Sequence, residues 1–290
     1  MGRESKDLEN SMKIEKLACI MGIWEEQNML PLALESTKDV VHKYYILHKS
    51  GRDKTKEVLD MCIKKWDLNV EYINSEMRLR EGRMELIKKA EADGYEWFLI
   101  QDGDEVFYTT GERALKNFAV ILEDSNIQGI YSPMVYLKHD LIHHKEPFKK
   151  GYGKDKILIV PHPTILKKGR IKWCPETGDV PISSGHIISL YSPIKFDCNV
   201  KTPLRRLLRT HLYAWEKVSD SYKTTTIEDF AMEKRKCKTI EELEQKAIEY
   251  ITKDIKSCKV YDENKYYLYP EVIKKYLNKN HIYGYEGELL

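Results

Sequence analysis

The sequence predicts an α/β fold with a mostly parallel central sheet flanked by helices. Over the first third of the chain, short apolar segments alternate with amphipathic segments of helical length. Such alternation is typical of right-handed β-α-β units, which build a parallel sheet with helices on both faces. Hydrophobic residues make up 42% of the chain and charged residues 32%, a balance that suits a globular protein.

The alternation runs from residue 17 to residue 101. Pro31 is tolerated only in the first turn of a helix, so the first helix is expected to begin close to it. The clearest helix spans residues 53–66, where apolar side chains recur at helical spacing on one face. The expected strands are 17–23, 40–47, 68–73 and 97–101, and the expected helices are 28–37, 53–66 and 80–92.

Beyond residue 107 the alternation weakens. A helix is expected to begin at Thr239, because Glu242 follows three residues later as in a capping box. The tail from Tyr261 is rich in tyrosine and is expected to pack as a small appendix. The other expected elements are helices at 110–122 and 202–217, strands at 129–135, 156–160 and 164–166, and an irregular segment at 169–184.

Residues 138–154 hold three histidines among many lysines. His139 and His143 have the H-x-x-x-H spacing of some zinc ligands, but no third ligand is near them in the sequence. The segment is therefore interpreted as a loop or lid.

Length, charge and cysteine content narrow the class of protein. The 290 residues suffice for a polar leader at 1–15, a main domain at 16–218 and a helical extension at 219–290. A net charge of +2 gives no bulk electrostatic reason to expect nucleic acid as a partner. No segment resembles a signal peptide or a membrane span, so a cytoplasmic protein is expected, with peripheral attachment to a membrane left open. The six cysteines form no C-x-x-C pair and are expected to be reduced thiols.

The segment EWFLIQDGDEVF, residues 96–107, sets an apolar run directly against three acids. Asp102, Asp104 and Glu105 repel one another, and each resists losing its water, so a positive partner is expected there. Asp102 and Asp104 lie just past the fourth expected strand. Ligands of parallel sheets bind beyond this end of the strands.

This acidic turn has the chemistry of a metal site. Two carboxylates separated by Gly103, which allows a tight turn, can direct oxygen ligands at one point. Mn²⁺ and Mg²⁺ prefer such ligands, and a bound ion would neutralise a diphosphate. The alternative for an isolated Asp-x-Asp (DXD) pattern is a solvated surface turn.

Four segments in the first 110 residues occur in the order of a known set of motifs. They read IMGIWEEQNMLPLALES, ILHKSGRDKTKEVL, LREGRMELIKKA and WFLIQDGDEVF. Together they resemble the inverting family 2 glycosyltransferases, which have the Rossmann-like GT-A fold. The chain departs from that pattern at His48 or Lys49, where an acid that helps hold the nucleotide base is usual, and at Met84, where Asn is usual.

The resemblance implies a glycosyltransferase of the hexosyltransferase type. Its donor would be a UDP- or GDP-sugar and its cofactor Mn²⁺ or Mg²⁺, while the acceptor could be a glycan, a lipid or a protein. The main domain would divide into a nucleotide-binding half at 16–107 and an acceptor half at 108–218. The residues placed near the nucleotide sugar are Glu25, Glu26, Asp53, Arg83 and Asp102, with Asp104 as the principal metal ligand beside Asp102.

Two of these positions have structural alternatives. Asp53 is at least as well suited to cap the helix that follows it. Arg83 could instead be a solvated residue on the surface of its helix.

Transfer with inversion needs a base on the acceptor hydroxyl. The segment KWCPETGDVP offers Glu176 as the first choice and Asp179 as the second, in the region where the family carries its acceptor loop. Both acids could equally stabilise a turn.

A basic helix follows this loop in the sequence. KTPLRRLLRTHLYAW places Lys201, Arg205 and Arg209 at four-residue spacing on one helix face. This face could be solvated, or its arginines could steady a diphosphate. His211 fits the late histidine that many GT-A enzymes supply to the metal, with His186 in reserve, although a lone histidine is more often structural.

Two other functions stay open. A relative that binds nucleotide or glycan without turnover is compatible with the altered positions His48 and Met84. A sugar nucleotidyltransferase is disfavoured, because MGIWEEQNML has one glycine and two acids where a glycine-rich basic loop is usual. A P-loop kinase is disfavoured because the sequence contains no G-x-x-x-x-G-K-[ST] motif.

Overall fold

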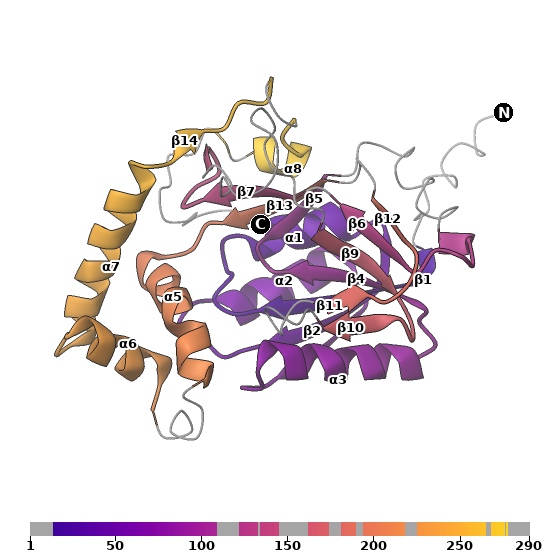
Figure 1. The fold of residues 1–290 in the computed structure, drawn as a ribbon, viewed down its shortest axis with the longest axis horizontal. Helices are drawn as coiled ribbons and strands as arrows, with labels where there is room; N and C mark the ends of the chain where they lie inside the picture. Colours follow the sequence, from indigo (N-terminus) through magenta and orange to yellow (C-terminus); the bar gives the residue numbers. More distant parts are fainter. Residues whose placement is uncertain are drawn as a thin grey trace.

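A seven-stranded, mostly parallel sheet forms the centre of the structure (Figure 1). The computed structural model describes residues 14–108, 122–132, 134–144, 162–173, 181–189, 194–217, 225–264, 268–275 and 277. The sheet has the order β12-β6-β9-β4-β1-β2-β3, and only β9 runs antiparallel to its neighbours. Its strands are β1 (Ile14–Ile23), β2 (Val41–His48), β3 (Val70–Asn74), β4 (Trp97–Asp102), β6 (Gly129–Ser132), β9 (His162–Lys167) and β12 (Ile187–Ser189).

Helices cover both faces of this sheet, as the sequence predicts. On β1, Cys19 belongs to the apolar cluster that includes α1 (Leu30–Thr37) and α2 (Thr55–Trp66). Its neighbour Ile20 belongs to the cluster of α3 (Leu79–Ala92). Successive side chains of a strand point to opposite faces, so a strand covered on both sides is apolar throughout. The predicted fold class is therefore confirmed.

Helix α3 lies close to β2 at Gly82. A Cβ atom on Gly82 would lie 3.0 Å from Leu47 Cγ and would overlap the end of that buried side chain. We therefore expect Gly82→Ala to destabilise the protein by about 1–3 kcal/mol through overpacking, although alanine normally stabilises a helix interior relative to glycine. Urea unfolding measures the change. Met84→Ala, at a 36% exposed position of the same helix, is the control. A Gly82→Ala variant with an unchanged free energy of unfolding would contradict the close packing.

A second, five-stranded sheet has the order β14-β8-β7-β13-β5. Its strands are β5 (Glu105–Tyr108), β7 (Met134–Lys138), β8 (His143–His144), β13 (Ile194–Asn199) and β14 (Lys259–Val260). Tyr261 and Tyr269 are buried against Phe196 of β13, so the described part of the tyrosine-rich tail packs onto this sheet. The short helix α8 (Glu271–Lys274) joins the same cluster.

Three helices stand together at the left of Figure 1. They are α5 (Pro203–Lys217), α6 (Ile227–Arg235) and α7 (Ile240–Ile255). Leu207 and Leu208 of α5 form an apolar cluster with Ala231 of α6 and Ala247 of α7. The predicted start of α7 is confirmed, because the Glu242 N–H donates to Thr239 Oγ1 over 3.3 Å.

Several expectations for the second half of the chain were wrong. Residues 129–135 hold not one strand but parts of β6 and β7, which belong to different sheets. The irregular segment 169–184 contains the hairpin β10 (Ile171–Trp173) and β11 (Pro181–Ser183), and the loop 138–154 contains β8. Strand β13 and helix α6 had not been expected. Strands β8, β10 and β11 have only two or three residues, too few to show periodicity. Strand β13 alternates apolar and polar residues over 194–199, and that signal was missed.

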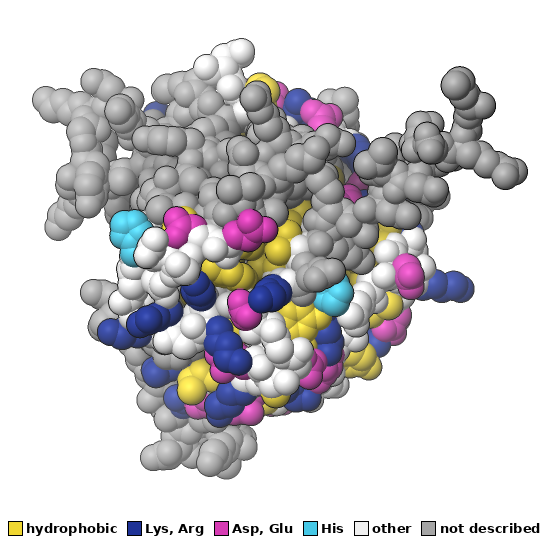
Figure 2. Space-filling model, turned by 90° about the vertical axis from the view of Figure 1, so that its right-hand side faces the viewer, with side chains coloured by type: hydrophobic (Ala, Val, Ile, Leu, Met, Phe, Trp, Pro, Cys, Tyr) yellow, Lys and Arg dark blue, Asp and Glu magenta, His cyan; other side chains and the backbone are white. Residues whose placement is uncertain are grey.

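Other expectations stay untested. The strand expected at 156–160 and all but the last residue of the helix expected at 110–122 lie outside the described residues. The division into domains at 218 and 219 stays a prediction. Within the described ranges, no helix is long and apolar enough to cross a membrane. On the face drawn in Figure 2, the described basic and acidic side chains are intermixed, in line with the nearly balanced net charge.

Candidate functional site

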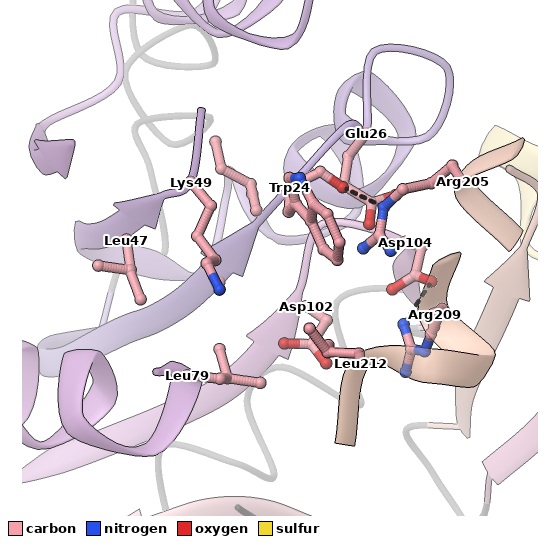
Figure 3. Close-up of a pocket in the computed structure, with 12 residues that line it drawn as sticks. Trp24, Glu26, Leu47, Lys49, Leu79, Asp102, Asp104, Arg205, Arg209 and Leu212 are labelled. Carbon is pink, nitrogen blue, oxygen red and sulfur yellow. Dashed lines mark hydrogen bonds and ion pairs between the residues drawn. The ribbon is translucent and has the colours of Figure 1, made fainter. Parts of the chain in front are cut away.

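An open pocket lies at the carboxyl ends of β1, β2 and β4, and α5 closes one side of it (Figure 3). The empty volume of the pocket, including the part that is open to solvent, is about 600 Å³. The polar and charged side chains that line it are Glu26, Lys49, Asp102, Asp104, Arg205 and Arg209. The pocket thus occupies the edge of the sheet where the sequence places a ligand site.

The acidic turn is held close to β1 at Gly103. The Gly103 N–H donates to the Gly22 carbonyl over 3.1 Å. A Cβ atom on Gly103 would lie 2.9 Å from Ile23 Cγ2 and 3.0 Å from Glu26 Cγ. Its φ angle lies outside the left-handed region. Residues 103 and 104 form a turn as expected, but glycine is needed there for space and not for its conformational freedom.

Asp102 and Arg83 form an ion pair at the end of β4. An Nη atom of Arg83 contacts Asp102 Oδ1, and only 5% of the Arg83 side chain is exposed. The Asp102 side chain is 25% exposed and lines the pocket, while its backbone N–H donates to Glu105 Oε2 over 2.7 Å. Arg83 thus reaches Asp102 from α3 without lining the pocket. The alternative of a solvated surface arginine is wrong, and a role at the nucleotide sugar stays a prediction.

Asp104 is buried and paired with Lys201, the residue two positions before α5. Lys201 Nζ lies 2.9 Å from Asp104 Oδ2 and also contacts Glu26 Oε1. Arg209 Nη1 lies 4.0 Å from the same Asp104 oxygen. The positive partner that the acidic turn requires is therefore present within the chain.

The buried carboxyl groups of Asp104, Glu26 and Asp197 differ in their affinity for protons. Burial alone would raise the pKa of Asp104, but the charges of Lys201 and Arg209 outweigh it and hold the pKa below its ordinary value. Burial raises the pKa of Glu26 to about 7, although Lys201 opposes the change. Burial, together with the nearby Asp104 carboxylate, raises the pKa of Asp197 well above its ordinary value. At neutral pH Asp104 is thus ionised, whereas Asp197 is mostly neutral.

Trp24 and Arg205 form one wall of the pocket. The Arg205 guanidinium stacks on the Trp24 ring, with Cζ 3.4 Å from the ring centroid, and its Nε donates to the Trp24 carbonyl over 3.1 Å. Lys49 Nζ lies 5.6 Å from the same ring centroid. Burial lowers the pKa of Arg205 to about 10, so the guanidinium remains charged at neutral pH. Arg209 is more accessible, because 36% of its side chain is exposed.

Glu25 and Asp53 lie beside the pocket without lining it. Both Asp53 carboxylate oxygens have structural partners: Oδ1 accepts from Thr55 Oγ1 over 2.7 Å, and Oδ2 accepts from the Gln27 N–H over 3.1 Å. Asp53 therefore organises the turn before α2, but it is not the helix cap that its structural alternative predicts, because the N-cap position is Lys54. Glu25 Oε1 accepts from the Arg52 N–H over 3.2 Å, and its Oε2 lies 4.0 Å from Arg205 Nε.

The structure does not bring His211 to the acids. Arg205, Arg209 and Leu212 line the pocket at helical spacing, and His211 lies on another face of α5. Its Nε2 accepts from Arg235 Nε over 3.1 Å, and its ring packs edge-on against Phe230 of α6. The two candidate bases, Glu176 and Asp179, lie outside the described residues.

Sequence reasoning missed several residues of the site. Trp24 was quoted only as part of a motif, and Lys201 only as part of a basic helix face. Asp197 was not considered, although an acid between Phe196 and Cys198 on a strand is an unusual sequence signal. The roles of all three depend on contacts between distant segments.

The donor set at Asp104 does not fit a resident Mn²⁺ or Mg²⁺. Lys201 and Arg209 already approach the Asp104 carboxylate, and Arg83 occupies one oxygen of Asp102. Within the described ranges, no three His, Cys, Asp or Glu side chains are grouped so that they could hold a metal ion. A divalent ion bound to Asp104 would be repelled by an ammonium and a guanidinium on the same carboxylate.

Comparisons with known proteins find similarity only among solved structures. No family model and no curated protein sequence matches the chain. Staphylococcus aureus TarS is 13% identical with a TM-score of 0.45, over 68% of this chain and 39% of that chain. GalNAc-T7, solved with UDP, GalNAc and Mn²⁺, is 12% identical with a TM-score of 0.43, over 84% and 59%. A mannosyltransferase from Pyrobaculum calidifontis, solved with GDP-Man and Mn²⁺, is 10% identical with a TM-score of 0.40, over 82% and 74%.

These similarities are remote. The chain spans less than two thirds of the length of TarS and of GalNAc-T7. At such low identities the function has to be inferred from the site itself. TarS, GalNAc-T7 and the mannosyltransferase are GT-A-type glycosyltransferases, the class that the sequence motifs resemble.

Proposed function

We propose that the protein is a glycosyltransferase that uses a UDP- or GDP-sugar as donor. The observation that carries the proposal is a pocket at the carboxyl ends of parallel strands in which Arg205, Arg209 and Lys49 accompany the motif acid Asp102. A diphosphate needs charge-assisted hydrogen bonds, which guanidinium and ammonium groups supply. A ribose needs a hydrogen-bond acceptor, for which the partly exposed Asp102 is suited.

The proposed reaction inverts the anomeric carbon. The acceptor oxygen forms a bond to that carbon while the bond to the diphosphate oxygen breaks, and the nucleoside diphosphate leaves. The hydroxyl proton passes to Glu176 or Asp179 as general base. Arg209 and Arg205 stabilise the negative charge that develops on the leaving diphosphate. The acceptor and the cytoplasmic location stay predictions.

Binding without turnover is the second candidate. It is favoured by the engagement of Asp104 with Lys201, because the resemblance implies a metal ligand at this position. Incubation with UDP-sugars and GDP-sugars separates the two candidates, since a glycosyltransferase slowly hydrolyses its donor while a binding protein leaves it intact. Absence of both binding and hydrolysis with every donor would contradict both candidates.

Arg209 provides the test of the diphosphate site. Arg209→Ala is expected to weaken binding of the nucleoside diphosphate about 10–100-fold, because it removes a charge-assisted contact. Isothermal titration with UDP and GDP measures the change. Arg235→Ala removes the same charge from α6, away from the pocket, and should leave the affinity unchanged. Equal losses in the two variants would contradict a specific role for Arg209.

A further inference from the structure

The most unusual group in the molecule is the buried ammonium of Lys201. The Lys201 side chain is 0% exposed, and its Nζ contacts two carboxylates, Glu26 Oε1 and Asp104 Oδ2. Glu26 follows β1, Asp104 follows β4, and Lys201 lies between β13 and α5. The ammonium therefore ties together three segments that meet only in the folded protein.

Lys201 cannot easily leave this position. A buried ammonium has lost its hydration, and the carboxylates that contact it compensate for that loss. Asp104 in turn needs the ammonium, because its carboxylate is buried and Lys201 Nζ lies 2.9 Å from its Oδ2. The buried charges thus depend on each other within the resting protein.

A divalent ion would have to compete with these cations. Mn²⁺ or Mg²⁺ binds carboxylate oxygens at about 2.0–2.2 Å. An ion at Asp104 Oδ2 would share that oxygen with an ammonium 2.9 Å away and would lie near the Arg209 guanidinium. The other motif acid, Asp102, is paired with Arg83. Both acids of the motif thus already have cationic partners.

We infer that Lys201 is the built-in cation of the acidic turn and that the site binds its nucleoside diphosphate without a divalent metal. The inference rests on the proposed function for the identity of the ligand. Arg209 and Arg205 line the pocket beside the turn, so their guanidinium groups take the diphosphate charge that a metal would otherwise neutralise. Asp104 then has the role of positioning Lys201 and Arg209 instead of holding an ion.

The first test uses the unchanged protein. UDP, GDP and their sugar conjugates are titrated calorimetrically in EDTA and again in Mn²⁺. The inference predicts dissociation constants that agree within about twofold, a difference far below the tenfold that 1.4 kcal/mol represents. Binding that is more than tenfold tighter in Mn²⁺ would overturn the inference and leave the proposed function standing. Failure to bind under both conditions would overturn the proposed function, and the second test would then decide the inference.

The second test needs no nucleotide. Removing the ammonium in Lys201→Ala leaves the carboxylates of Glu26 and Asp104 facing an opening. Electron paramagnetic resonance of added Mn²⁺ is expected to show an affinity at least about tenfold higher for this variant than for the unchanged protein. Lys201→Met, which fills the space with apolar atoms, is the control and should not gain affinity.

An unchanged protein that binds Mn²⁺ as tightly as Lys201→Ala would overturn the inference. If the Lys201 variants fold poorly, Asp104→Asn replaces them, because tight Mn²⁺ binding by the unchanged protein that is abolished in a folded Asp104→Asn variant would place the ion on the acidic turn and overturn the inference. Weak Mn²⁺ binding by the unchanged protein, together with nucleotide binding in EDTA, would support the inference without any variant.

Discussion

Replacing Lys201 by Met is expected to lower the free energy of unfolding by about 3–5 kcal/mol. The change removes the ammonium that contacts Asp104 and Glu26, both of which are at most 5% exposed. Asp104 would then remain as a buried carboxylate without its closest ion-pair partner, with the more distant guanidinium groups of Arg209 and Arg205 near it, and burial of a poorly paired charge is costly. Urea unfolding at neutral pH, followed by circular dichroism, measures the loss.

A surface lysine provides the control for this prediction. Lys64 is exposed on α2, and Lys64→Met should change the free energy of unfolding by no more than about 0.5 kcal/mol. The double variant Lys201→Met with Asp104→Asn should be more stable than the sum of the two single changes predicts, because the two groups interact directly. Additive losses, or a Lys201→Met loss below about 1 kcal/mol, would show that the ammonium does not compensate the buried acids.

Glu26 is expected to make the protein less stable as the pH rises from 4.5 to about 7. Burial raises the pKa of Glu26 to about 7 in the folded state, against an ordinary value of 4.5. Between these values the folded state binds more protons than the unfolded state, so stability falls as the pH rises. The stabilising contribution of protonated Glu26 is fully present below pH 4.5 and is lost above about pH 7. It amounts to about 3 kcal/mol, because each pKa unit corresponds to about 1.4 kcal/mol.

The Glu26→Gln variant isolates this contribution. Gln keeps a hydrogen-bond acceptor for Lys201 but cannot titrate, so the variant should lack this part of the pH dependence. Urea unfolding of both proteins from pH 4.5 to 8 gives the difference. Asp197, whose pKa is also raised, lowers the stability with rising pH in both proteins alike. Asp104, whose pKa is lowered, raises the stability with rising pH, and it does so at lower pH. Parallel pH curves for the two proteins would contradict the raised pKa of Glu26.

The first half of the fold could be predicted because its signals are local. Leu17–Ile23 is apolar throughout, since both faces of β1 are covered, and the apolar face of α2 is visible in its own spacing. Strand β13 does alternate apolar and polar residues over 194–199, a local strand signal that was missed, but its pairing partners cannot be read from the sequence. In its register with β5, Asp197 pairs with Glu105. Strands β6, β9 and β12 of the seven-stranded sheet lie between these two residues in the sequence. Pairing over such distances leaves no local pattern.

Residues of the site were predictable to different degrees. The position of Asp102 and Asp104 at the edge of the sheet follows from the strand that precedes them. The separation of α5 into two faces follows from helical spacing, but the spacing does not say which face meets the pocket. His211 was assigned to the metal from its order along the chain, whereas the packing of α5 against α6 directs it to Arg235.

The sequence by itself determined an alternating α/β half and a cluster of acids at the ligand edge of its sheet that requires positive charge. Only the tertiary structure decided where that charge comes from. Arg83 reaches Asp102 from α3, and Lys201 reaches Asp104 from the segment before α5. The physical reason is that Coulomb attraction depends on the distance between atoms in the folded chain and not on their separation along it. A composition can show that acids need partners, and the packing of distant segments decides which cations reach them.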